Sequence, residues 1–209
     1  MRVVIISDTH NLLSHMDVPD GDILIHCGDF CSAGTMPEVE QFRKDFQALP
    51  HKHKIVVAGN HDWPFQREQD AARQALNQFT YLEDEGTEVE GLKLYGSPWQ
   101  PAFGRWAFNL PRKSAELADK WRQIPDDVDV LITHGPPHGI LDRVKFGTRV
   151  GCEHLRERVD KLQPRVHCFG HIHEAYGQEQ HGDTLFVNAA SVDIWYHLAN
   201  PAVVVDLVA

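Results

Sequence analysis

The stretch Ile55-Val56-Val57-Ala58-Gly59-Asn60-His61-Asp62 decides how this chain of 209 residues is interpreted. Its first four residues are apolar and three of them are β-branched, which predicts a short buried strand. Gly59 ends that strand. An amide, an imidazole and a carboxylate follow in consecutive positions, so the candidate functional side chains begin where the strand ends.

The same arrangement recurs four more times, and each time an apolar run leads into side chains that can bind a metal ion. The four segments that follow the runs are Ser7-Asp8-Thr9-His10, His26-Cys27-Gly28-Asp29, Thr133-His134-Gly135 and Gly170-His171-Ile172-His173. One such run would carry little weight. Five of them argue for a single site.

The spacing of the polar residues supports a metal site. Asp8-x-His10 and His171-x-His173 each place two ligands at i and i+2, which point to one side of an extended backbone. Asp29 follows a glycine, which permits a sharp turn that brings the carboxylate inward. Oxygen and imidazole ligands suit Mn²⁺, Fe, Zn²⁺ or Co²⁺ better than Ca²⁺ or Mg²⁺.

The rest of the chain predicts one α/β domain over residues 1–209, with two sheets packed between helices. Glu90-Gly91 is the turn of a hairpin over Thr87–Tyr95, which adds an antiparallel element. The other expected strands are Arg2–Ile6, Asp22–His26, Ile55–Ala58, Asp129–Thr133, Val166–Phe169, Thr184–Asn188 and Ala202–Val208. The expected helices run from Thr35 to Pro50, from beyond Pro64 to about Phe79, from Ser114 to about Ile124, and from Cys152 to Leu162.

Composition excludes several classes of function. The formal net charge of −10 argues against broad binding to a nucleic-acid backbone, which needs Lys and Arg. Apolar residues make up 42% of the chain, too many for a disordered protein, yet no apolar run is long enough to span a membrane. There is no secretory signal pattern and no CxxC pair among the four cysteines, so we expect buried, reduced thiols and a cytoplasmic location.

The five motifs, in this order, resemble the calcineurin-like metallophosphoesterase family over residues 7–173, including Thr133-His134-Gly135-Pro136-Pro137. Gly96-Ser97-Pro98-Trp99-Gln100-Pro101 further resembles the branch that contains the animal, brain-type metallophosphoesterase-domain proteins and their bacterial relatives. The resemblance implies a four-layer α-β-β-α sandwich with mixed sheets and two metal ions at the edge of the sheets.

The resemblance also implies roles for single residues. One metal would be held by Asp8, His10, Asp29 and His173, and the second by Asp29 as a bridge together with Asn60, His134 and His171. His61 resembles the residue that contacts the phosphate and protonates the leaving group; the alternative is that it only shapes its loop. Asp62 either orients His61 or caps the turn that follows.

Two cations, Mn²⁺, Fe or Zn²⁺, about 3.5–4 Å apart can hold a bridging hydroxide for in-line attack on phosphorus. Asp29 is followed by Phe30-Cys31-Ser32-Ala33-Gly34, without the arginine with which the family's protein phosphatases clamp a monoester dianion. We therefore expect a phosphodiesterase for small substrates, with cyclic nucleotides as one candidate. The alternatives are a phosphomonoesterase and a metal-binding interaction module with little turnover.

The irregular segment Gly96–Arg112 is rich in proline and aromatic residues. Phe103 and Trp106 either line a substrate pocket or plug the core, and Trp99 favours the core. His138 and Asp142 are candidate substrate contacts, with a structural role the stronger interpretation. The histidines expected to be solvated are His15, His51, His53, His154, His181 and His197.

Overall fold

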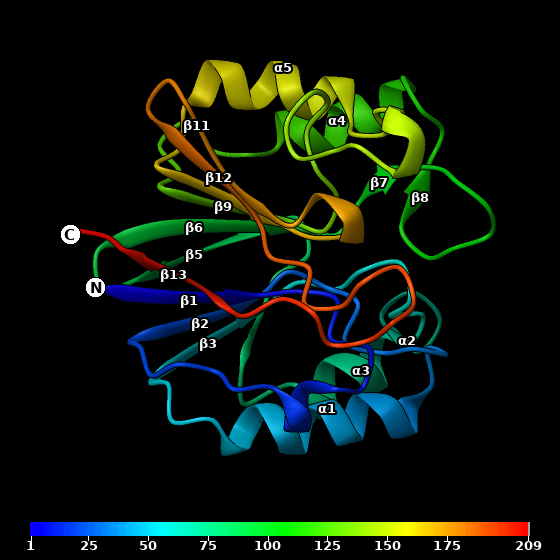
Figure 1. Cartoon of the computed structure of the whole chain (residues 1–209), viewed down its shortest axis with the longest axis vertical. Coiled ribbons are helices and arrows are strands. Elements are labelled where there is room, and N and C mark those ends of the chain that lie inside the picture. The colour runs from blue at the N-terminus through cyan, green and yellow to red at the C-terminus, as the bar shows by residue number, and fades with distance from the viewer. Residues whose placement is uncertain (209) are drawn as a thin grey trace.

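In the computed structural model, which describes residues 1–208, two β-sheets lie face to face between two layers of helices. Figure 1 shows α4 (Ala115–Arg122) and α5 (Glu153–Leu162) above one sheet, and α1 (Met36–Ala48) with α3 (Gln69–Ala75) below the other. The short helix α2 (Pro64–Arg67) lies beside α3. The four layers confirm the expected α-β-β-α sandwich.

The first sheet has the strand order β13-β1-β2-β3-β4, and only β13 runs antiparallel to its neighbour. β13 pairs with β1, so segments from opposite ends of the described chain lie side by side. The strands are β1 (Arg2–Ile6), β2 (Ile23–His26), β3 (His53–Val56), β4 (Thr80–Tyr81) and β13 (Val203–Asp206).

The second sheet has the order β11-β12-β10-β9-β6-β5, with a parallel centre and an antiparallel strand at each edge. The hairpin β5–β6 turns at Glu90-Gly91, as predicted, with positive φ at both residues. The strands are β5 (Glu85–Val89), β6 (Leu92–Ser97), β9 (Val130–Thr133), β10 (Val166–Phe169), β11 (Gly177–His181) and β12 (Thr184–Asn188). A separate pair, β7 (Gln100–Pro101) and β8 (Asn109–Leu110), lies in the aromatic segment.

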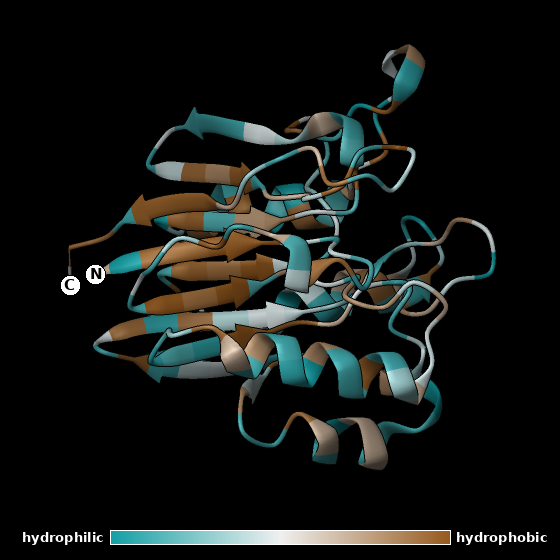
Figure 2. Cartoon of the chain, turned by 60° about the horizontal axis from the view of Figure 1, so that its bottom comes forward, coloured by the Kyte–Doolittle hydropathy of each residue, from teal (hydrophilic) through white to brown (hydrophobic). Residues whose placement is uncertain are grey.

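Alternation along the strands builds three apolar layers. Val3 and Ile5 of β1 face the second sheet, whereas Val4 and Ile6 face α1. On the other side of the molecule, Trp121 of α4 packs between the second sheet and α5. Figure 2 shows the apolar strands at the centre and mostly hydrophilic helix surfaces outside. Both faces of each sheet are therefore covered, as parallel strands require.

Most predicted helices are confirmed, and one is shorter than expected. Leu117 donates its N–H to Ser114 Oγ at 3.1 Å, so Ser114 is the N-cap of α4, at the predicted start of this helix. The helix expected to reach Phe79 ends at Ala75, because the chain must turn into β4, which pairs with β3. Phe79 lies outside the helix and packs edge-on against Phe46. Its apolar character therefore serves this packing contact and does not indicate another helical turn.

Two expectations about polar and sulfur side chains have different outcomes. The four cysteines are buried and free, as predicted. His51 was expected to be solvated but is buried, with its ring bonded to the carbonyl of Pro19. His53 and His154 are half-buried, whereas His15, His181 and His197 are exposed. No helix within residues 1–208 is both long and apolar enough to cross a bilayer.

Candidate metal centre

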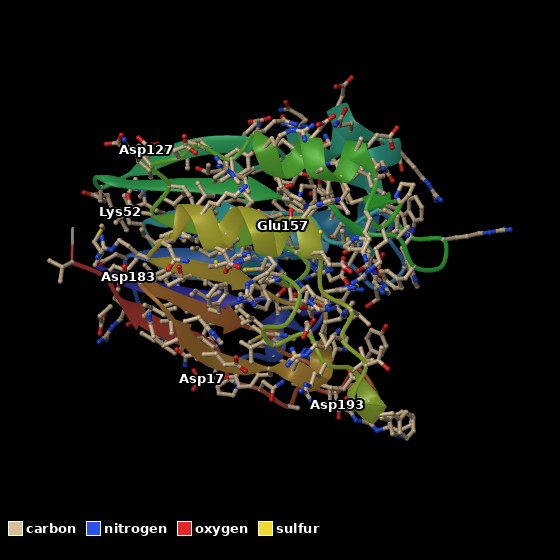
Figure 3. The ribbon with its side chains drawn as sticks, turned by 90° about the horizontal axis from the view of Figure 1, so that it is seen from above. Asp17, Lys52, Asp127, Glu157, Asp183 and Asp193 are labelled. Carbon is tan, nitrogen blue, oxygen red and sulfur yellow. The ribbon has the colours of Figure 1, made fainter. Side chains whose placement is uncertain are left out.

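All nine sequence-predicted site residues lie at one end of the sandwich, just beyond the carboxyl ends of parallel strands. The loops after β1, β2 and β3 supply those from the first sheet, and the loops after β9 and β10 supply those from the second. In Figure 3, Asp193 marks this end, and Lys52, Asp127 and Asp183 mark the opposite one. Because both sheets present the same end here, side chains that meet can lie far apart in sequence, as Asp8 and His173 do at a separation of 165 positions.

Three overlapping groups of side chains converge at this end. Each group places its potential ligand atoms within 4.8 Å of one another: Asp8, His10 and His173; His10, Asp29 and His61; Asp29, His134 and His171. Asn60 joins the last group, since its Oδ1 lies 2.9 Å from His134 Nε2. Asp29 belongs to two groups and connects residues of both sheets.

The backbone that carries these residues is not extended, so the simple i, i+2 argument for Asp8 and His10 is wrong. Their φ angles are 52° and 41°, and Asp29 and His171 have φ of 57° and 69°. Such left-handed conformations are uncommon outside glycine and cluster at functional sites. Sharp turns after each strand, rather than strand alternation, therefore gather the side chains.

Glycine is required beside the carboxylates for steric reasons. A Cβ atom at Gly59 would collide with Asp29 Oδ1, and one at Gly170 would collide with Asp8 Oδ2. The two glycines let backbone approach the carboxylates closely enough for N–H donation. His171 N–H donates to Asp8 Oδ2 at 2.9 Å, directly after Gly170.

Three of the histidine rings are oriented by backbone carbonyls. Each ring donates its Nδ1–H: His10 to Cys31 O at 3.0 Å, His134 to Cys27 O at 2.9 Å, and His173 to Asp193 O at 3.0 Å. With Nδ1 engaged in this way, Nε2 is the ring nitrogen left to bind a metal ion once it gives up any proton, the arrangement typical of metal-binding histidines. The Nε2 atom of His10 is buried and has no hydrogen-bond partner among residues 1–208, and a bound metal ion would satisfy it.

The charge of the centre also fits cations. Asp8, Asp29 and Asp62 are buried, and among residues 1–208 no Lys or Arg forms an ion pair with them. Burial opposes ionisation, but the charge on His134 holds the pKa of Asp29 below its usual range. In return, despite its burial, Asp29 raises the pKa of His134 to about 9. Buried carboxylates need paired positive charge, and divalent ions would supply it.

Asp62 organises the turn rather than the His61 ring. Its carboxylate accepts the N–H groups of Asp29 at 2.8 Å, Cys31 at 2.9 Å and Gly59 at 2.7 Å. Burial, with the nearby Asp29 charge, raises the pKa of Asp62 to about 8, against the effect of these donors. Of the two roles considered for Asp62, the contacts therefore support holding the turn.

His61 is held from three sides. Its Nδ1–H donates to Ser32 O at 2.7 Å, its backbone N–H donates to Asp29 Oδ1 at 2.7 Å, and its ring stacks on Trp106 with centroids 4.2 Å apart. The side chain is 8% exposed. With Nδ1 engaged, Nε2 is the ring atom that is able to exchange a proton with a bound molecule.

Aromatic rings lie against histidines of all three groups. Phe103 lies 5.0 Å from His171 and Tyr196 lies 4.7 Å from His10, centroid to centroid, in addition to the stack of Trp106 on His61. Tyr196 was not predicted, nor was the Asp193 carbonyl that orients His173. The only sequence signal for them is an apolar aromatic run, Ile194-Trp195-Tyr196, in the loop that follows β12.

The remaining candidates have structural roles. Trp99 donates to Asp84 Oδ2 at 2.9 Å and packs edge-on against Phe108, in line with the core interpretation. Asp142 is buried and accepts hydrogen bonds from Gly139 N–H at 2.8 Å and from the Arg149 side chain at 2.7 Å. These bonds hold the loop that contains Asp142. No hydrogen bond is formed by the His138 side chain within residues 1–208.

Comparison with known proteins gives a consistent assignment. The family model for calcineurin-like phosphoesterases matches residues 1–175. Metallophosphoesterase domain-containing protein 1 of Homo sapiens is 43% identical over 231 residues, covering 99% of this chain and 71% of that protein. UPF0046 protein K07C11.7 of Caenorhabditis elegans is also 43% identical, covering 91% of this chain and 69% of that protein.

A solved structure, the phosphopantetheinyl hydrolase PptH from Mycobacterium tuberculosis, shares the fold at a TM-score of 0.63 and 14% identity, covering 93% of this chain and 90% of that one. The Thermus thermophilus protein TT1561 matches at a TM-score of 0.60 and 16% identity, covering 90% and 88%. Together with the sequence matches, the fold and the clustered Asp and His residues lead to one conclusion: the chain belongs to the calcineurin-like phosphoesterase family.

Proposed function

We propose that this protein is a two-metal phosphodiesterase that hydrolyses small phosphodiesters, with cyclic nucleotides among the candidates. The observation that carries the proposal is the set of three overlapping Asp and His groups, two of which share Asp29. In this proposal Asp8, His10, Asp29 and His173 bind one ion. Asp29, Asn60, His134 and His171 bind the other.

Two such ions, Mn²⁺, Fe or Zn²⁺, would lower the pKa of bound water and neutralise charge on the reacting oxygens. The chain's own residues do the rest. The carboxylates of Asp8 and Asp29 stay ionised because the charges and hydrogen bonds of His173 and His134 outweigh their burial. The carbonyls that bind Nδ1 keep the ligand histidines in one tautomer and one ring plane.

His61 is the proposed proton donor to the departing oxygen. Its ring is fixed by Ser32 O and by the stack on Trp106, so Nε2 has a defined direction. A general acid can protonate the leaving group only if its proton-bearing atom faces that group. Rigid support of the His61 ring favours such an orientation. The role of Asp62 is to hold the turn on which His61 stands.

A diester is the better substrate because a cationic clamp is missing. In the segment Phe30–Gly34, Cys31 N–H points to Asp62, and Ser32 N–H and Ala33 N–H point to Glu38. No arginine takes part in this segment or pairs with the buried carboxylates within residues 1–208. A phosphomonoester dianion gains more from such a cation than a diester monoanion does.

The proposal is tested by comparing bis(p-nitrophenyl) phosphate with p-nitrophenyl phosphate, each with added Mn²⁺. We expect faster turnover of the diester and loss of both activities after chelation. Faster turnover of the monoester would make the protein a phosphomonoesterase. No turnover of either compound by folded protein that retains two ions would instead favour the metal-binding interaction module.

A further inference from the structure

A second feature lies beside the candidate metal centre: a cavity of about 320 Å³. It opens between residues 100–103 on one side and Val144, Val150 and Gly151 on the other, and it reaches the His171 ring. Its volume is at the small end of the range for ligand pockets, roughly 300–1,000 Å³, and is suited to one ring system. Since His171 belongs both to the cavity wall and to a metal-binding group, the cavity adjoins the place where a phosphoryl group would sit.

The cavity wall is mainly apolar. Phe103 is 41% exposed, and its ring stands 5.0 Å from His171 at an angle of 59°. The other apolar side chains of the wall are Pro101, Ala102, Pro136, Val144, Val150 and Ile172. An exposed aromatic face opposite aliphatic side chains favours a flat guest, because a ring can contact both walls at once.

The charges of the wall argue against an anionic guest. Arg112 is the only Lys or Arg among the lining residues, and it donates to the carbonyls of Val150 at 2.9 Å and Gly151 at 2.6 Å and pairs with Glu153. The other charged lining residue, Glu174, accepts from Lys145 N–H at 3.0 Å at the rim. A second phosphate would therefore meet a carboxylate and no unpaired guanidinium.

We propose that this cavity binds the organic group of the substrate, specifically a flat, uncharged ring of about nucleobase size. The proposal rests on the proposed function, which places the phosphoryl group at the metal centre, and it deepens that function by naming the substituent. Phosphoesters of a ring-bearing alcohol are preferred over esters of small alkyl alcohols or of alcohols that carry another phosphate. Phe103 and Val150 are the residues that set this preference.

The test measures binding, so that turnover does not enter the result. Phenylphosphonate and methylphosphonate share the same anionic head, and their P–C bonds are not cleaved by phosphoester hydrolysis. Their dissociation constants are measured by calorimetry on protein loaded with Mn²⁺, whose metal content is checked separately. We expect wild-type protein to bind phenylphosphonate roughly tenfold more tightly, a difference that corresponds to about 1.4 kcal/mol.

Two variants change the cavity in opposite ways. Val150→Phe fills it and Phe103→Ala removes its aromatic wall, and each should bring the affinity ratio close to one with unchanged affinity for methylphosphonate. The matched controls are Val204→Phe on β13 and Phe146→Ala, whose side chain is 96% exposed. Both controls should keep the wild-type ratio. If Val150→Phe does not fold, Phe103→Ala still tests the proposal, because it changes a partly exposed residue.

The outcomes separate the two proposals. Equal affinity of wild-type protein for both phosphonates would overturn the cavity proposal and leave the phosphodiesterase proposal standing. Failure of both phosphonates to bind metal-loaded protein that still hydrolyses bis(p-nitrophenyl) phosphate would overturn the cavity proposal alone, whereas failure of binding together with absence of diester hydrolysis would overturn both proposals. A tenfold ratio that survives Val150→Phe and Phe103→Ala but is lost in Tyr196→Ala would place the ring against Tyr196 and overturn the cavity proposal.

Discussion

The two sheets contribute different chemistry to the same centre. The first sheet supplies every carboxylate, namely Asp8, Asp29 and Asp62, together with Asn60, His10 and His61. The second sheet supplies only imidazoles, His134, His171 and His173. The first sheet thus carries the negative charge and the proposed acid, and the second adds imidazole ligands that reach the same centre. This division predicts that substitutions in the loops of the first sheet lower activity and metal binding more than substitutions in the loops of the second sheet.

The layer beneath the site repeats this asymmetry. Each sheet contains a buried Thr–His pair with Oγ1 and Nε2 2.9 Å apart: Thr9 with His26, and Thr133 with His167. His26 Nδ1 also accepts Gly28 N–H at 3.2 Å and so holds the turn that leads to Asp29. His167 Nδ1 is buried and has no hydrogen-bond partner in the part of the chain that the structure describes. In the first sheet the Thr–His pair therefore also holds a turn of the metal centre. In the second sheet the histidine bonds only to its threonine.

The largest effect is expected at His61. A nucleoside alkoxide is a poor leaving group and gains about 10²–10⁴-fold from a general acid, whereas p-nitrophenolate gains far less. His61→Ala should therefore retain both metals, lose most activity on an alkyl-leaving diester and lose less on bis(p-nitrophenyl) phosphate. Equal losses on both substrates with both metals retained would defeat the general-acid role.

Asp29 and Asn60 test the bridge between the sheets. Asp29 belongs to two metal-binding groups and Asn60 contacts one histidine, so Asp29→Ala should lose more bound metal than Asn60→Ala. Metal content per protein after dialysis provides the measurement. Equal losses from the two variants would reject Asp29 as the shared ligand.

Acid should destabilise the metal-free protein through the buried histidines. Burial lowers the pKa of His26 and of His167 to about 3, whereas an unfolded histidine titrates near 6.5. The stability is therefore complete above about pH 6.5 and is lost as the pH falls, by roughly 1.4 kcal/mol per pH unit for each residue. Between pH 6 and 4, His167→Leu should reduce the slope of unfolding free energy by that amount. An unchanged slope in urea titrations would show that His167 is not neutral when folded.

At neutral pH the two buried histidines should behave differently. His26→Leu leaves the Gly28 N–H without its acceptor, which costs roughly 1–3 kcal/mol, and it should weaken metal binding by loosening the turn before Asp29. His167→Leu removes a buried nitrogen without a partner among residues 1–208, and Thr133 Oγ1, which loses its bond to His167, still donates to Gly135 O, so the effect should stay within about 1 kcal/mol. Urea unfolding of the two variants at pH 7.5 compares them directly. A larger loss from His167→Leu would contradict the asymmetry.

The smallest effects are expected at two helix N-termini, one on each side of the sandwich. Glu38 of α1 accepts the N–H groups of Ser32, Ala33 and Thr35, and Ser32 O in turn holds His61. Glu38→Ala should therefore lower activity on alkyl diesters as well as stability. Ser114→Ala should cost about 1 kcal/mol of stability and leave activity unchanged. Thermal melting and a diester assay on both variants check this, and an activity loss in the Ser114 variant would count against it.

The strands and the identity of the clustered residues could be predicted because buried parallel strands are short apolar runs, and polar residues follow them directly. The local geometry could not. Left-handed φ angles at Asp8 and His10 depend on contacts with distant loops, since the N–H of His10 donates to Asp29 O. Tyr196 contacts His10 across 186 positions of sequence, and no local pattern encodes such a contact. Strand β11 was missed because its residues are mostly exposed and polar.

The pairing of β1 with β13 has a consequence for synthesis. Arg2 and Asp206 are 204 positions apart, so one edge of β1 stays open until β13 has left the ribosome. At about 5–20 residues per second, that interval is roughly 10–40 s. During this time an apolar strand with unpaired N–H and C=O groups is available to neighbouring nascent chains. Slow translation or loss of β13 should therefore lower the yield of folded protein through aggregation, and a chaperone that shields β1 should restore it.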